Sequence, residues 1–167
     1  MSKLKKIWHN QLVNDSFCKL KSLKVDGCEK LLNVFPLNIH GGLLSLESLE
    51  VSGCDSLKEI VVLRGINSER LSFANLQKLR VSRCRSLKNL FSASILAKEE
   101  APDMFYFPKL TSLELYYLPQ LRSFYPGRHK VEGTVLKTLE LFYCGIHDTN
   151  EEGQMQQPLF LSLVEEV

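Results

Sequence analysis

One frame of apolar residues recurs along this 167-residue chain and constrains its fold more than any other feature. Residues 17–35 read F-x-x-L-x-x-L-x-V-x-x-C-x-x-L-x-x-V-F, and further copies of the frame occupy residues 46–60, 73–91, 107–124 and 136–144. Successive copies are 26, 30, 34 and 26 residues apart, as counted at Leu23, Leu49, Leu79, Leu113 and Leu139. A fixed frame with a tail of variable length predicts one repeated element joined by connections of different length.

The stretch x-L-x-[VL]-x in each copy alternates apolar and polar residues, as a short strand with one buried face does. Repeating such a strand with a return segment between copies stacks the strands in parallel. We therefore predict a leucine-rich repeat solenoid of the α/β class. It would form a curved arc with the parallel sheet on its concave face and with irregular loops and short helical turns on its convex face.

The spacing of the frame predicts a single leucine-rich repeat domain over residues 1–167. We expect about five units, at 17–42, 43–72, 73–106, 107–132 and 133–158, with partial units at 1–16 and 159–167. Neither end carries the polar cap that a repeat stack needs, so we expect the chain to be a fragment of a longer protein.

Charge and hydropathy exclude several kinds of partner. The 21 Lys and Arg residues nearly balance the 19 Asp and Glu residues, and a net charge of +2 does not predict binding to nucleic acid or to a membrane surface. The chain has no apolar run of roughly 18 residues and no signal-peptide core, so we expect neither a membrane span nor secretion. These features favour the cytoplasm or the nucleus.

Four of the five cysteines, Cys28, Cys54, Cys84 and Cys144, occupy the same position of the frame. Leu118 takes this position in the fourth copy. Cys28, Cys54 and Cys84 are expected to be buried structural thiols. A strand spacing of about 4.8 Å would also permit a Cys28–Cys54 disulfide, but a reducing compartment favours free thiols.

The chain lacks C-x-x-C and H-x-x-x-H spacings, and its four histidines lie in different connecting segments. With no Ser, His and Asp set in a catalytic context either, we expect no metal, no cofactor and no enzymatic activity.

The residues that alternate with the buried leucines and valines should form columns on the open side of the sheet. Basic residues gather in the third unit and aromatic residues in the fourth and fifth, and Arg and Tyr are enriched in binding hot spots. Our candidate partner-binding residues on this concave surface are Lys24, Glu50, Lys78, Arg80, Arg83, Glu114, Tyr116, Tyr117, Glu140, Phe142 and Tyr143. Alternatively, the basic residues are only solvated and the aromatic rings pack on the loops after each strand. We expect Phe142 to be more buried than Tyr116, because it lacks a polar tip.

The wording of the repeats resembles a known family. Three segments are similar to the C-terminal leucine-rich repeats of plant nucleotide-binding disease-resistance proteins of the coiled-coil class. They read LKSLKVDGCEKLLNVF, LESLEVSGCDSLKEIV and FPKLTSLELYYLPQLRSFYPG. The resemblance implies a module that recognises a pathogen effector or a modified host protein and that restrains a nucleotide switch in a longer parent. This chain itself has no G-x-x-x-x-G-K-[ST] phosphate loop, so the switch would lie in a neighbouring nucleotide-binding domain.

Two other functions fit the same residues. The repeats could select substrates for an F-box type ubiquitin ligase, or they could form a free-standing truncated scaffold. An F-box in a preceding segment would favour the first of these, and the incomplete units at both ends are the reason for considering the second.

Overall fold

The computed structural model describes residues 4–8, 18–35, 45–64, 73–94, 107–122 and 135–145. The four histidines, most of the connections between units and the expected partial unit at 159–167 lie outside these ranges. The boundaries of the units therefore stay predictions. Within the described ranges, no helix is long and apolar enough to span a membrane.

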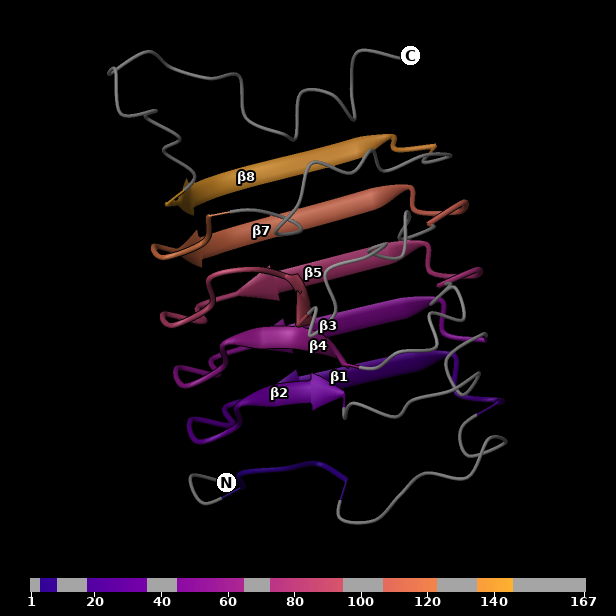
Figure 1. Cartoon of the computed structure of the whole chain (residues 1–167). Helices are drawn as coiled ribbons and strands as arrows, with labels where there is room; N and C mark the ends of the chain where they lie inside the picture. The colour runs from indigo at the N-terminus through magenta and orange to yellow at the C-terminus, as the bar shows by residue number, and fades with distance from the viewer. Residues whose placement is uncertain are drawn as a thin grey trace.

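A five-stranded parallel sheet contains the repeated strand of every copy. Its order is β1-β3-β5-β7-β8, and Figure 1 shows these strands stacked side by side and pointing the same way. The bounds are β1 Ser22–Asp26, β3 Ser48–Ser52, β5 Lys78–Ser82, β7 Ser112–Leu118 and β8 Thr138–Cys144. The five central leucines that define the spacing are paired in register from strand to strand. The predicted parallel stack is thus confirmed.

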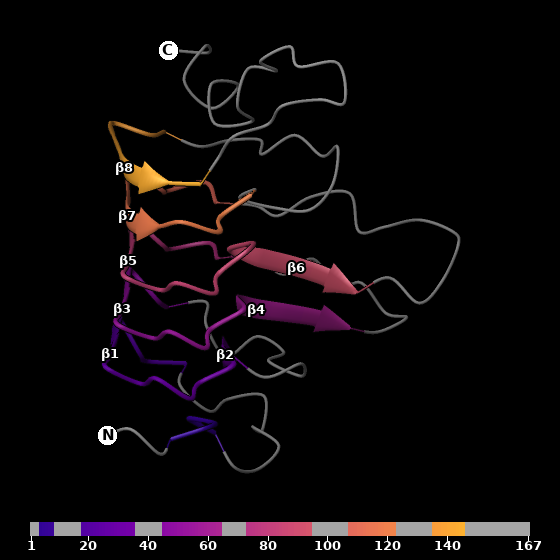
Figure 2. The same ribbon diagram turned by 90° about the vertical axis from the view of Figure 1, so that its left-hand side faces the viewer.

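A second, smaller parallel sheet lies behind the first. It contains β2 Asn33–Phe35, β4 Glu59–Arg64 and β6 Phe91–Ser94 in the order β2-β4-β6. Figure 2 shows the strands of the large sheet end-on, with β4 and β6 running away from them. We expected short helical turns in the return segments, but the described return segments are extended strands. β-Branched and aromatic residues favour strands, and Val34, Phe35, Ile60 and Val61 are buried in these segments.

Two kinds of tight turn explain the rest of the frame. The backbone N–H of Leu76 donates to the carbonyl of Phe73 at 3.1 Å, which closes an F-x-x-L turn before β5. After the strand, the N–H of Leu87 donates to the carbonyl of Cys84 at 3.2 Å and closes a C-x-x-L turn. Turns of the second kind recur after β1, β3 and β7. Most of the described apolar residues of the frame pack into one core cluster, in which the rings of Phe73 and Phe107 stack at 5.4 Å.

The frame cysteines have a local role in these turns. The thiol of Cys54 donates to the carbonyl of Ser52 at 3.3 Å, and Cys84 bonds to Ser82 in the same way. Cys28, Cys54 and Cys84 are buried free thiols, as predicted. Burial raises the pKa of the Cys28 thiol, so this group stays protonated at neutral pH.

The two ends of the described stack differ. Beside β1 and β2, residues 4–8 cover the core, and the indole of Trp8 donates to the carbonyl of Val34 at 2.8 Å. At the other end, Leu141 of β8 faces the core side but is 40% exposed, because no described strand lies beyond β8. The β8 end is therefore the less covered end of the described core.

Candidate partner-binding face

Side chains that alternate with the buried leucines and valines form the open face of the large sheet. The register pairs Lys24 with Glu50, then Arg80, Glu114 and Glu140 in one central column. A parallel column ends in Tyr116 and Phe142, which are partners across β7 and β8. The register confirms the columns predicted from the spacing, and all the candidate residues lie on the open face or at its rim.

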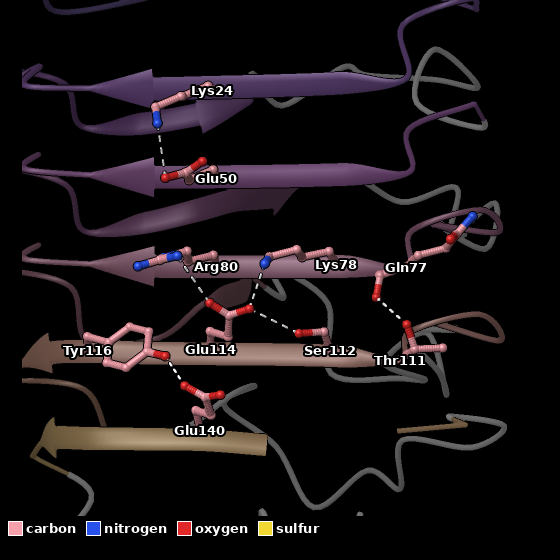
Figure 3. Close-up of polar contacts among 10 residues, drawn as sticks. All are labelled: Lys24, Glu50, Gln77, Lys78, Arg80, Thr111, Ser112, Glu114, Tyr116 and Glu140. Carbon is pink, nitrogen blue, oxygen red and sulfur yellow. Dashed lines mark hydrogen bonds and ion pairs between the residues drawn. The ribbon is translucent and has the colours of Figure 1, made fainter. Parts of the chain in front are cut away.

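Ion pairs link the open face across the strands (Figure 3). The ammonium group of Lys24 lies 3.1 Å from a carboxylate oxygen of Glu50. On the neighbouring strands, the Glu114 carboxylate lies 2.7 Å from the Lys78 ammonium and 3.4 Å from the Arg80 guanidinium. The Ser112 hydroxyl donates to Glu114 at 3.2 Å. Glu114 is therefore the centre of a network that joins β5 and β7.

Glu114 is the one buried charged side chain among the described residues, with 8% of its surface exposed. Burial raises its pKa, but the hydrogen bond and charge of Lys78, the Ser112 hydroxyl and the charge of Arg80 outweigh burial and hold the pKa below its ordinary value. Glu114 is thus ionised at neutral pH, and its single negative charge is shared between two cations.

Arg80 belongs to the same network and is not a free surface residue. Its guanidinium carbon lies 5.3 Å from the centre of the Tyr116 ring, and its Nε is buried without a hydrogen-bond partner. The Tyr116 hydroxyl in turn donates to Glu140, and this bond raises the pKa of Tyr116. Ring and carboxylate together hold the Arg80 side chain against the sheet.

The predicted basic gathering in the third unit is therefore only partly neutralised. Lys78 and Arg80 pair with Glu114, and Arg85 lies 3.8 Å from Asp55. Arg83 is exposed and makes no ion pair with any residue that the structure describes. Arg83 is thus the basic residue of this group that has no described ion pair to give up when a partner binds.

The aromatic cluster, which we define as Tyr117, Phe142 and Tyr143, lies at the end of β7 and β8. The rings of Tyr117 and Tyr143 stack with centres 5.4 Å apart and planes 11° apart. Phe142 meets both rings edge-on, at 5.6 and 4.6 Å. The exposed fractions are 47% for Tyr117, 50% for Phe142 and 71% for Tyr143. The rings pack on one another and still present a large apolar surface to solvent.

The prediction that Phe142 is more buried than Tyr116 is wrong. Tyr116 is only partly exposed because it lies between Arg80 of β5 and Glu140 of β8. Phe142 lies on the edge strand of the described sheet, where no described strand lies beyond it, and it is 50% exposed despite its contacts with Tyr117 and Tyr143. Position in the sheet outweighs the presence of a polar tip.

The rim of the open face has an unusual backbone conformation that we did not predict from the sequence. The first residue after β1, β3 and β5, and its counterparts in β7 and β8, have positive φ angles. They are Gly27, Gly53, Arg83, Tyr117 and Tyr143, with φ of 65°, 61°, 53°, 54° and 52°. This left-handed conformation favours glycine and is strained for larger residues. Gly27 and Gly53 at equal frame positions were the sequence signal for it.

The candidate residues thus fall into three groups: the Lys24–Glu50 pair, the Glu114 network with Arg83 beside it, and the aromatic cluster with Glu140. No group of three or more His, Cys, Asp or Glu residues within the described ranges could hold a metal ion. The arrangement offers charged and aromatic contact area, which suits recognition of another protein.

Comparisons with known proteins agree with the repeat frame. Residues 1–72 match the family model described as plant disease resistance protein RPS2-like, leucine-rich repeats. A probable disease resistance protein of Arabidopsis thaliana is 32% identical over 126 residues, which are 75% of this chain and 10% of that protein. The repeats of this chain are similar to the leucine-rich repeats of plant disease-resistance proteins. No solved structure matches it.

The resemblance to plant disease-resistance repeats noted in the sequence is confirmed. Because the chain spans only 10% of the length of its Arabidopsis relative, the activity and partners of the whole relative do not transfer to it directly.

Proposed function

We propose that this chain is a recognition module of plant innate immunity that binds a pathogen effector or a modified host protein through its open face. The observation that carries the proposal is the combination of Arg83 with the exposed aromatic cluster on one rim. Arginine and tyrosine contribute most to hot spots, and three exposed aromatic rings in contact are rarely left uncovered on a monomer without a function.

The candidate residues have different parts in this proposal. Five residues contact the partner directly: Arg83, Tyr117, Glu140, Phe142 and Tyr143. The others hold the shape and charge of the face on which the partner lies: Lys24, Glu50, Lys78, Arg80, Glu114 and Tyr116. Catalysis has no place in the proposal, because none of these residues forms a nucleophile and base pair.

In a longer parent protein, the module would act inside the cell beside a nucleotide-binding domain and would restrain its switch until the partner binds. The family similarity and the small share of the Arabidopsis relative that this chain spans support this part. We further propose that the stack curves toward the open face, which would then be concave, as in a solenoid whose variable tails lie on the outer side.

A differential capture experiment tests the proposal. The full chain, an Arg83→Glu variant and a Lys88→Glu control are expressed with an affinity tag in plant cells, and the captured proteins are compared. Lys88 belongs to the same repeat, is exposed and lies before β6, away from the open face. We expect at least one protein that the wild type and the control capture and the Arg83 variant loses.

The same experiment distinguishes the other functions. Capture of ubiquitin-ligase subunits would favour the substrate-selecting alternative. Identical captured sets for all three proteins would contradict binding through the open face.

A further inference from the structure

We propose that the aromatic cluster and Glu140 receive an arginine side chain of the protein partner. This inference rests on the proposed function and names the chemistry of the partner at one site. The site comprises the rings of Phe142, Tyr143 and Tyr117 and the carboxylate of Glu140.

The open face already contains one occupied example of such a site. The Arg80 guanidinium of β5 lies over the Tyr116 ring at 5.3 Å and 3.4 Å from the Glu114 carboxylate, both on β7. A cation is therefore held by a ring and a carboxylate two residues apart on one strand. The ring attracts the cation through its quadrupole and the carboxylate through its charge.

The same two positions recur one strand further along. The register pairs Tyr116 with Phe142 and Glu114 with Glu140, so β8 carries a ring and a carboxylate at the same two register positions. Here no described cation is paired with the carboxylate. Glu140 accepts a hydrogen bond from the Tyr116 hydroxyl, is exposed, and forms none of the described ion pairs.

Residues 145–167 of the sequence contain no Lys or Arg and include Asp148, Glu151, Glu152, Glu165 and Glu166. This segment is therefore acidic and contains no basic residue that could compete for Glu140. An arginine of the partner fits the site better than a lysine, because its planar guanidinium can stack on a ring and pair with a carboxylate at once.

The rim backbone supports a function for these rings. Tyr117 and Tyr143 have left-handed φ angles of 54° and 52°, at positions where the first two repeats have glycine. Large residues in this conformation are strained and are found where the side chain has a use. We infer that Tyr117 and Tyr143 serve to enlarge the aromatic surface around Phe142.

Titration with a small probe tests the inference without knowledge of the partner. The full chain, labelled for NMR, is titrated with the blocked tripeptide acetyl-Gly-Arg-Gly-amide and with the same peptide containing citrulline, the neutral isostere of arginine. We expect saturable shifts of the Phe142 and Tyr143 ring signals with the arginine peptide, and binding roughly tenfold weaker with the citrulline peptide.

Two variants locate the site. Glu140→Gln should weaken binding of the arginine peptide, whereas Glu50→Gln, the equivalent position of β3, should leave it unchanged. Tyr143→Gly should abolish the shifts and keep the fold, since Gly27 and Gly53 already occupy this position in other repeats. Unchanged amide signals of β1 and β3 verify that the variants are folded.

Three results would overturn the inference: no saturable shift, an equal response to citrulline, or an unaffected Glu140→Gln variant. None of these would contradict the capture of a protein through Arg83. The failure of this inference is thus separable from the failure of the proposed function.

Discussion

Substitutions at equivalent positions of two repeats test the positive φ angles at the rim of the open face most sharply. Arg83 and Gly53 occupy the same position, with φ of 53° and 61°. A non-glycine residue in this conformation costs about 1–2 kcal/mol, and glycine costs about 0.5–1 kcal/mol through the greater freedom of the unfolded chain. The difference predicts that Arg83→Gly stabilises the fold by about 0.5–1 kcal/mol and that Gly53→Arg destabilises it by a similar amount.

Among the described residues, no other contact of these two positions contributes to the expected values. Arg83 is exposed and has no described ion pair to lose. A Cβ atom at Gly53 would lie 3.4 Å from the backbone nitrogen of Gly27, which is an ordinary contact. The change at either position therefore reports the backbone conformation.

The assay is urea unfolding followed by circular dichroism, with free energies of unfolding compared at 25 °C. Lys88→Gly is the matched control, because Lys88 is exposed in the same repeat and is not among the residues with positive φ. It should lose about 0.5–1 kcal/mol. The reasoning fails if Arg83→Gly is destabilised as much as Lys88→Gly.

Three further predictions concern the core, the ion pairs and the thiols. Leu79→Ala removes a fully buried side chain of the middle strand and should cost about 2–5 kcal/mol in urea unfolding; a loss below about 1 kcal/mol would place Leu79 outside the core. The pKa of Glu114 is lowered from 4.5, so its ion pairs stabilise the fold above that pH and are lost as the pH falls through the folded pKa. Wild type should therefore lose more stability than Glu114→Gln on acidification below pH 4.5, and parallel curves would contradict the network. Ellman's reagent should modify exposed Cys18 before buried Cys54 and Cys84, whereas uniform rates would contradict their burial.

The repeat frame predicted the large sheet because its signals are local and recur. Leucines at a fixed place before each cysteine determine the strand, its register and the buried face. The small sheet was not predicted, because NVF, EIVVLR and FSAS have no pattern of apolar and polar residues in common. These segments become strands by pairing with one another across the stack, which no single segment reveals.

The candidate face was predictable as columns but not as contacts. The pairing of Glu114 with Lys78 and Arg80 depends on side chains from repeats 34 residues apart, so a list of basic residues overstated the free positive charge. The left-handed rim was visible at Gly27 and Gly53. Arg83, Tyr117 and Tyr143 are residue types that do not predict a positive φ angle. It could have been predicted there only because these residues occupy the same position of the repeat as Gly27 and Gly53.

Photo-crosslinking tests most directly whether the open face binds a protein. Benzoylphenylalanine replaces Tyr117 in one sample and Leu32 in another; the two residues are 47% and 49% exposed, but Leu32 lies on the turn between β1 and β2. Both proteins are expressed in plant cells and irradiated. We predict a discrete adduct with another protein from position 117 and none from position 32. An adduct from position 32 alone, or equal adducts from both, would contradict recognition through the open face.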